Sequence, residues 1–149
     1  MSRSLSSRDF QEMGLLKHYR IVRRWACYNN DISDAEIELL IYFDCLKTFR
    51  KHDYEIGVLT YPWNNRRWNK LLKNDWIVVW RTGGRKDQRY TIYELSFKCK
   101  HLIRQMYRIM LGEEDIPTSV RRNKLYKRDT YTAKVMSTAM DIVNKDKTR

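Results

Sequence analysis

Basic and amide side chains gather between residues 60 and 90, where they could bind anions and hydrogen-bonding groups. This stretch holds eight Lys and Arg residues against two acids, Asp75 and Asp87. Its net charge of +6 is half of the +12 that the whole chain carries. Such side chains contact phosphate groups and base edges in DNA. The candidate DNA-binding residues are Asn64, Asn65, Arg66, Arg67, Asn69, Lys70, Lys73, Arg81, Arg85, Lys86 and Arg89.

Different members of this set are expected to make different contacts. The N-terminal half of a recognition helix reaches deepest into the major groove, so Asn65 and Arg66 are the predicted base readers. Arg85 and Lys86 are expected to contact phosphate or to enter the minor groove. Trp63 has two interpretations: it stacks on a sugar, or it closes the start of the helix against the core. The second interpretation is favoured.

Other chemistries find little support. Cys45, His52, Cys99 and His101 are a conceivable zinc set, but no compact ligand pair such as Cys-x-x-Cys is present. The chain also lacks a glycine-rich phosphate loop, a motif around a Ser or Cys nucleophile, and the clustered acids of a metal-dependent nuclease. We therefore expect no enzyme activity, no cofactor and no metal site.

A basic helix is predicted over residues 62–73. Pro62 suits the first turn of a helix, and Trp68, Leu71 and Leu72 recur at the spacing of one apolar face. The basic side chains lie on the opposite face. One side of this helix is thus expected to pack inward while the other meets solvent.

A β-hairpin is predicted to follow this helix. Residues 76–80 and 89–95 are rich in β-branched and aromatic side chains, which is typical of strands. The tip between them, 81–87, contains Gly83 and Gly84, which are expected to supply the positive φ of the turn. A basic helix followed by a basic hairpin indicates a winged helix. The expected fold class is mainly α with a small β-hairpin wing (α+β).

The rest of the core is expected to surround the basic helix. Ser33 and Glu36 form a capping box that opens a largely apolar helix, and Cys45 on that helix is expected to be buried. Residues 48–59 predict a brief or irregular helix. Three tryptophans are expected in the core: Trp68, Trp76 and Trp80.

Terminal helices complete the predicted organisation. Residues 1–8 are expected to form a flexible tail, and 9–149 a single domain. Within that domain, amphipathic helices over 9–28, 97–111 and 118–144 carry apolar stripes without evident partners. A second copy of the chain would cover them, so a homodimer is expected.

Two motifs between residues 32 and 99 resemble a known family. Residues 32–40, Ile-Ser-Asp-Ala-Glu-Ile-Glu-Leu-Leu, are similar to a helix opening of the form Leu-Thr-x-x-Gln-x-x-x-Leu. Asp87-Gln88-Arg89, Leu95-Ser96 and Cys99 reproduce the spacing of an Asp-x-Arg, Leu-Thr, Gly wing signature. These motifs resemble those of the MarR-type winged-helix regulators, with Ser in place of Thr and Cys in place of Gly.

The resemblance implies several properties. MarR-type regulators use a winged helix-turn-helix (residues 32–99 here) and dimerise through helices from both termini. By this resemblance Arg89 makes the DNA contact of the wing, and Asp87 orients it. The glycine that ends the family's recognition helix is Asp75 in this chain, and Asp adopts the left-handed conformation more readily than most residues.

Composition limits the setting and the partners. A chain of 149 residues with a net charge of +12 and a pI of about 9.8 favours a polyanionic partner. Three unpaired cysteines fit a reduced compartment, the cytoplasm or a nucleoid, with a virion as the alternative. No apolar run approaches the roughly 20 residues that span a bilayer, so no membrane partner is expected.

Three functions remain open from the sequence. The favoured one is a MarR-like transcriptional regulator that binds double-stranded DNA. The second is an architectural or virion-associated nucleic-acid-binding protein without sequence specificity. The third is a winged-helix protein–protein adaptor, which would leave the charge of the helix and wing unexplained. The sequence identifies no small-molecule effector.

Overall fold

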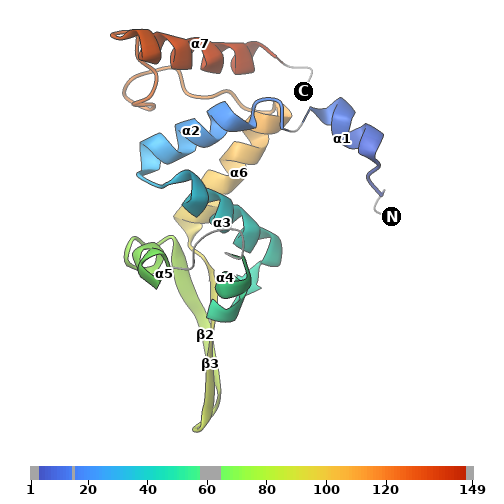
Figure 1. The fold of residues 1–149 in the computed structure, drawn as a ribbon, viewed down its shortest axis with the longest axis vertical. Coiled ribbons are helices and arrows are strands. Elements are labelled where there is room, and N and C mark those ends of the chain that lie inside the picture. Colours follow the sequence, from blue (N-terminus) through green and yellow to red (C-terminus); the bar gives the residue numbers. More distant parts are fainter. Residues whose placement is uncertain (1–3, 15, 58–64, 147–149) are drawn as a thin grey trace. The chain divides into compact units, whose positions relative to one another are not determined.

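The computed structural model describes residues 4–14, 16–57 and 65–146. The chain divides into two compact units, Met1–Ile32 with Arg104–Arg149 (unit 1) and Ser33–Ile103 (unit 2). The described residues form helices and a small antiparallel sheet of three strands, which confirms an α+β fold (Figure 1). Unit 2 nearly coincides with the segment predicted to bind DNA.

The elements follow the chain in this order. Unit 1 contains α1 (Ser7–Met13), α2 (Tyr19–Asn30) and α7 (Tyr131–Lys145). Unit 2 contains α3 (Asp34–Leu46), β1 (Thr48–Phe49), α4 (Lys51–Gly57), α5 (Asn65–Lys73), β2 (Ile77–Arg85) and β3 (Gln88–Leu95). Helix α6 (Phe97–Leu111) begins in unit 2 and ends in unit 1.

Helix α3 begins with the predicted capping box. The Ser33 hydroxyl accepts a hydrogen bond from the Glu36 amide at 3.1 Å, and the Glu36 carboxylate accepts one from the Ser33 amide at 3.2 Å. Ile37, Leu40 and Phe43 are buried, as a central core helix requires. The prediction that Cys45 is buried is wrong: its side chain lies on the one side of α3 that stays exposed.

Residues 48–59 contain a strand that the sequence did not predict. Phe49 of β1 pairs with Tyr93 of β3, so the sheet has the order β1-β3-β2. The brief helix expected here is α4, which buries Tyr54. Residues 58 and 59 lie outside the described residues.

The hairpin strands are longer than predicted. β2 runs to Arg85 and β3 starts at Gln88, so the turn contains only Lys86 and Asp87. The prediction that Gly83 and Gly84 form the turn is therefore wrong, because both lie inside β2. Gly84 nevertheless has a positive φ of 96°, and a Cβ there would come within 2.1 Å of the Gln88 carbonyl oxygen. Both features require glycine at this position.

Trp80 occupies a β-bulge. Val79 pairs with Tyr93 and Arg81 with Ile92, so Trp80 is the extra residue between two paired positions. Its side chain is 50% exposed, and the prediction that Trp80 belongs to the core is wrong. The bulge interrupts the alternation on which that prediction depended. Trp68 and Trp76 are buried as predicted.

Unit 1 differs from the predicted long terminal helices. Gly14 adopts a left-handed conformation that ends α1, so residues 9–28 form two helices instead of one. A capping box at Ser6 starts α1 within the predicted flexible tail. Residues 118–130 form a loop, and α7 begins only at Tyr131, with Thr130 as its N-cap. The helix predicted over 97–111 is confirmed as α6.

An aromatic cluster holds α5 in unit 2. The Trp68 ring lies 5.0 Å from the Tyr93 ring and 5.1 Å from the Tyr54 ring, between centroids. The Phe43 and Phe49 rings stack at 4.0 Å and meet Trp68 edge-on. One side chain of α5 therefore contacts α3, β1, α4 and β3, and such aromatic pairs stabilise beyond the area they bury.

Trp68→Ala is expected to destabilise the chain by about 3–5 kcal/mol, because it leaves a cavity among four rings. Urea denaturation followed by circular dichroism measures this change. Trp80→Ala is the matched control, since its side chain is 50% exposed, and its cost is expected below about 1 kcal/mol. Equal losses for the two variants would contradict the assignment of Trp68 to the core.

Candidate nucleic-acid interface

Helix α5 presents the predicted basic face to solvent. Trp68 and Leu71 are buried, and the helical period then leaves the opposite side chains exposed. The exposed members of the predicted set on α5 are Arg66, Asn69, Lys70 and Lys73, while Arg67 is half-buried. Asn64 and Trp63 lie outside the described residues. Asn65 begins α5, but its side chain is likewise outside the described part.

The C-terminal end of α5 is fixed against the start of α6. Asp75 takes the left-handed conformation with φ of 58°, and the Trp76 amide donates back to the Leu71 carbonyl at 3.0 Å. Lys98 donates to the Asn74 carbonyl, and its ammonium lies 4.2 Å from the centre of the Trp76 ring. Asp75 therefore adopts the left-handed conformation that was expected at this position.

A buried carboxylate underlies the basic face. Glu36 of α3 is 5% exposed and pairs with the Lys70 ammonium at 3.1 Å. Burial raises the pKa of Glu36, but hydrogen bonds from Ser33 and Lys70, together with the Lys70 charge, outweigh burial. The pKa therefore lies below its ordinary value of 4.5. Lys70 consequently links α5 to α3, in addition to its exposed position on the basic face.

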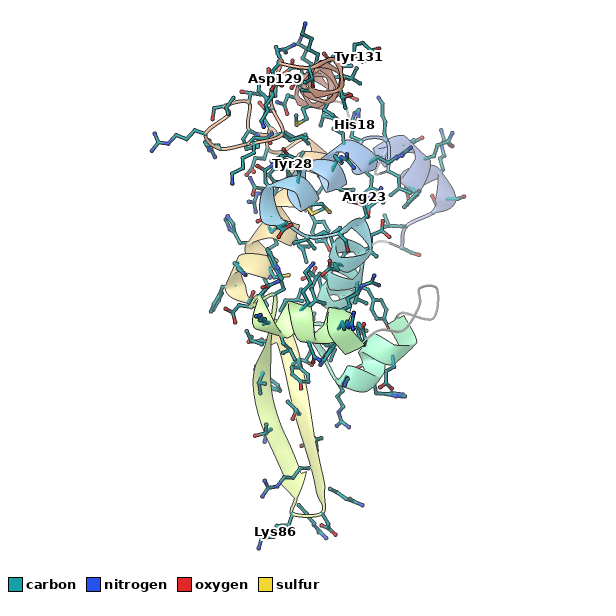
Figure 2. The ribbon with its side chains drawn as sticks, turned by 60° about the vertical axis from the view of Figure 1, so that its left-hand side comes forward. His18, Arg23, Tyr28, Lys86, Asp129 and Tyr131 are labelled. Atoms are coloured by element: carbon teal, nitrogen blue, oxygen red, sulfur yellow. The ribbon has the colours of Figure 1, made fainter. Side chains whose placement is uncertain are left out.

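The hairpin carries a second set of cations. Arg81, Arg85, Lys86 and Arg89 are all exposed, and Lys86 lies at the tip (Figure 2). In the described part of the chain, none of these four side chains forms an ion pair. Asp87 stands beside Lys86 in the turn, and no hydrogen bond joins Asp87 to Arg89 among the described residues. The orienting role of Asp87 stays a prediction.

One face of the hairpin is hollowed. Cross-strand pairs place Thr82 opposite Thr91 and Gly84 opposite Arg89, so these residues share a face. They line a hollow of about 490 Å³ together with Gly83 and Tyr90. Two hydroxyl groups and a guanidinium on one face are suitable donors for a phosphate group.

Two exposed residues near the hairpin were not among the predicted site residues. The Arg50 guanidinium lies 4.6 Å from the centre of the Tyr90 ring, and that ring in turn covers Gly83. Arg50 thereby adds an exposed cation beside the hairpin. Trp80 adds an exposed aromatic ring at the bulge. No local sequence pattern predicts either exposed position. The place of Arg50 depends on its contact with the distant Tyr90, and that of Trp80 depends on the register between β2 and β3.

Reactive groups are few among the described residues. The pKa of the Cys99 thiol is raised to about 12, first by burial and second by the Asp44 charge, against the opposing charges of Lys98 and Lys100. This thiol is protonated at neutral pH and unsuited to nucleophilic attack. No group of three His, Cys, Asp or Glu side chains in the described chain could hold a metal ion. No described helix has both the length and the apolar character that a membrane crossing requires.

Glu36→Gln is expected to lower the free energy of unfolding by about 1 kcal/mol at pH 7. Glutamine can keep the capping box, so the change removes mainly the charge opposite Lys70. The contribution of ionised Glu36 is fully present above pH 4.5 and is lost as the pH falls through its lower folded-state pKa.

The stability difference between wild type and Glu36→Gln should therefore vanish in acid. Urea unfolding between about pH 3 and pH 7 measures it. Glu113→Gln is the control, because that carboxylate is exposed. A wild-type advantage that is unchanged across this pH range would contradict the role of the Glu36 charge.

No protein-family model matches the chain, and comparisons with curated proteins and with solved structures likewise found no match. The function is therefore inferred from the chain's own residues.

Proposed function

We propose that the chain binds double-stranded DNA through α5 and the β2–β3 hairpin. The observation that carries this proposal is the exposed basic face of α5, whose opposite face is locked by Trp68 within the same unit as the basic hairpin. An α-helix fits the major groove, and a hairpin beside it reaches the flanking backbone or the minor groove. Exposed cations release counterions from DNA when they contact its phosphate groups.

Within this proposal the two elements differ in what they recognise. Arg66, near the N-terminal end of α5, is the base-reading candidate, because arginine pairs with two acceptors of guanine. Arg85, next to the hairpin turn, is a phosphate-contact candidate. The favoured biological role is a sequence-specific transcriptional regulator, and the rival is an architectural protein that binds every duplex alike.

Arg66→Ala is expected to cost about 1–3 kcal/mol on a preferred duplex and to relax discrimination at one base position. Arg85→Ala should weaken binding to all duplexes equally and lower the salt slope by about one. Titrations of the wild type and both variants against selected and scrambled duplexes, at several salt concentrations, measure these effects.

The outcomes separate the candidate functions. Equal losses for Arg66→Ala on both kinds of duplex would favour the architectural protein over the regulator. Unchanged binding for both variants would refute α5 and the hairpin as the DNA-binding surface. Arg104→Ala provides a control, because it removes an exposed positive charge from the part of α6 that lies in unit 1.

We also propose that the chain is a homodimer, joined through the outer face of α7. Met140 and Val143 are buried, and α7 contacts α2, so part of the predicted apolar stripe packs within the chain. Tyr131, Val135 and Ile142 remain 83%, 48% and 56% exposed. These three lie on one face, opposite to the buried side chains.

The exposed stripe of α7 is complementary to itself. An antiparallel pair of α7 helices centred between Thr138 and Ala139 would set Val135 of one copy against Ile142 of the other. The same arrangement would set the Tyr131 ring against the stem of Lys145. A two-fold axis makes both contacts occur twice, which suits a closed dimer.

Sedimentation should therefore give a particle of twice the 18.2 kDa chain. Val135→Glu alone, or Ile142→Lys alone, should yield monomers, because each buries an unpaired charge. Thr118→Glu is the control, since this exposed loop position lies outside α7. Mixing the Val135→Glu and Ile142→Lys chains should restore a dimer, in which the new charges face each other. A monomeric wild type at micromolar concentration would refute the dimer.

A further inference from the structure

Most of the net positive charge lies outside unit 2, which contains α5 and the hairpin and is called the winged unit from here on. Unit 1 has 17 Lys and Arg residues against 9 Asp and Glu, a net charge of +8. Unit 2 has 13 against 9, a net charge of +4. Two thirds of the net charge therefore lies in unit 1, outside the unit that contains the basic helix and hairpin.

The connection between α6 and α7 is long but tightly held. This segment, residues 112–130, is called the basic loop, and a loop longer than about 15 residues usually has a function of its own. Asn123 at its centre is fully buried. Its amide group donates to the Pro117 carbonyl at 2.8 Å, and its oxygen accepts from Asn29 at 2.8 Å and from the Leu125 amide at 3.0 Å.

Three further polar side chains fix the backbone of the basic loop. The Asn29 oxygen accepts from the Lys124 amide at 2.7 Å, and the Ser137 hydroxyl accepts from the Lys127 amide at 2.9 Å. Asn144 exchanges two hydrogen bonds with the backbone of Ile116, at 2.7 and 3.0 Å. Side chains of α2 and α7 thus hold the backbone of the loop at Ile116, Lys124 and Lys127.

The basic loop presents its cations to solvent. Arg121, Arg122 and Lys124 are exposed, and among the described residues they form no ion pair. Arg128, by contrast, is paired with Asp141 at 2.8 Å. Three cations therefore remain available to an anion from outside the chain.

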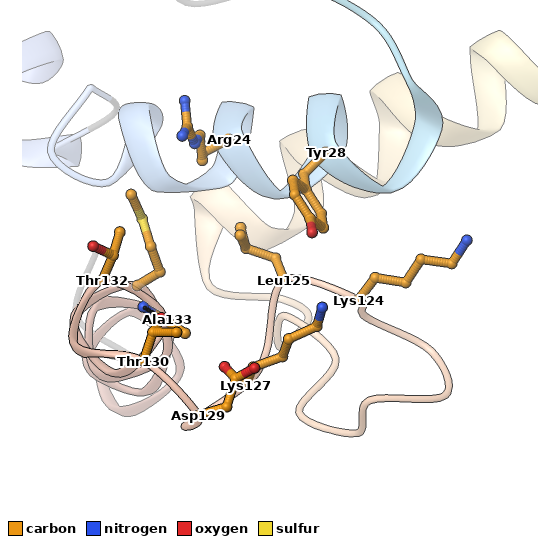
Figure 3. A pocket seen from close by; sticks show the side chains of 10 residues that line it. Arg24, Tyr28, Lys124, Leu125, Lys127, Asp129, Thr130, Thr132 and Ala133 are labelled. Atoms are coloured by element: carbon orange, nitrogen blue, oxygen red, sulfur yellow. Dashed lines mark hydrogen bonds between the residues drawn. The ribbon is translucent and has the colours of Figure 1, made fainter.

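A hollow of about 270 Å³ within unit 1 is lined in part by Lys124 of the basic loop (Figure 3). Arg24 of α2, Lys124 and Lys127 border it, and Asp129 is the one acid in its lining. The half-exposed Tyr28 ring extends into it from α2. Cations that alternate with an aromatic ring are typical of surfaces that follow a sugar–phosphate backbone.

We propose that the basic loop, with Arg24 and Tyr28, is a second DNA-contact surface that binds the phosphate backbone without reading sequence. This inference rests on the proposed binding of duplex DNA. It adds affinity that α5 and the hairpin do not provide, because each neutralised phosphate releases counterions. The rigid backbone of the loop lowers the entropy cost of holding several cations in place.

Two double variants of the full chain test the surface. Arg121→Ala/Arg122→Ala removes cations of the loop, and Arg24→Ala/Lys124→Ala removes cations beside the hollow. Arg8→Ala/Arg104→Ala is the matched control, because it removes the same charge from exposed helical positions of unit 1. Affinity for duplexes of about 30 base pairs is measured against salt concentration, with thermal unfolding as a check on folding.

Each loop variant is expected to lose affinity about tenfold at roughly 0.1 M salt and to lower the salt slope by about 1–2. The loss should be the same for selected and scrambled duplexes, and the control should change little. Loop variants that titrate like the control would overturn the inference while leaving the winged unit untouched.

Other outcomes separate this surface from the winged unit. Loss in the loop variants while Arg66→Ala and Arg85→Ala bind normally would support the loop and overturn α5 and the hairpin. If the loop variants bound duplex DNA normally but lost binding to single-stranded RNA, the proposal that the basic loop contacts duplex DNA would be overturned.

Discussion

The packing of the Trp68 ring among Phe43, Phe49, Tyr54 and Tyr93 is the contact on which unit 2 depends. Helix α5 is basic and has only nine described residues, fewer than the roughly 12–15 that an isolated helix needs in water. Its conformation must therefore come from tertiary packing. Because side chains from four elements pack against Trp68 of α5, the orientation of the basic face opposite to Trp68 is fixed as well. The Glu36–Lys70 pair then sets the rotation of α5 from a second point.

The hairpin is stabilised by a different contact, in which an aromatic ring packs directly against a glycine. Gly83 has no Cβ, and the Tyr90 ring occupies the space where one would lie, with the Tyr90 oxygen 2.6 Å from that position. Arg50 covers the same ring and so connects the hairpin to the segment before α4. Two isolated strands are marginally stable in water, and these contacts, together with the edge strand β1, stabilise the hairpin.

Local periodicity predicted what local forces decide. The Ser33–Glu36 spacing located the capping box of α3, the family resemblance implied the left-handed Asp75, and periodicity located the two faces of α5 and the extent of α6. It failed where distant residues decide. The bulge at Trp80 depends on the register with β3, and the basic loop depends on Asn123 and Asn29, which are 94 positions apart. The Glu36–Lys70 pair joins residues 34 positions apart, so the exposed cation of α5 was predictable and its partner was not.

The division of charge between the units has a consequence for recognition under the proposed function. Phosphate groups are alike at every step of a duplex, so cations on a loop add affinity for all sequences equally. Sequence choice can come only from side chains that reach base edges, and α5 offers few of them. Increasing the charge of unit 1 thus raises specific and non-specific binding by the same factor and leaves their ratio unchanged. A chain with a charge of +8 in unit 1, outside the unit that contains α5, is suited to staying on DNA. Discrimination among sites then depends on Arg66 and its neighbours.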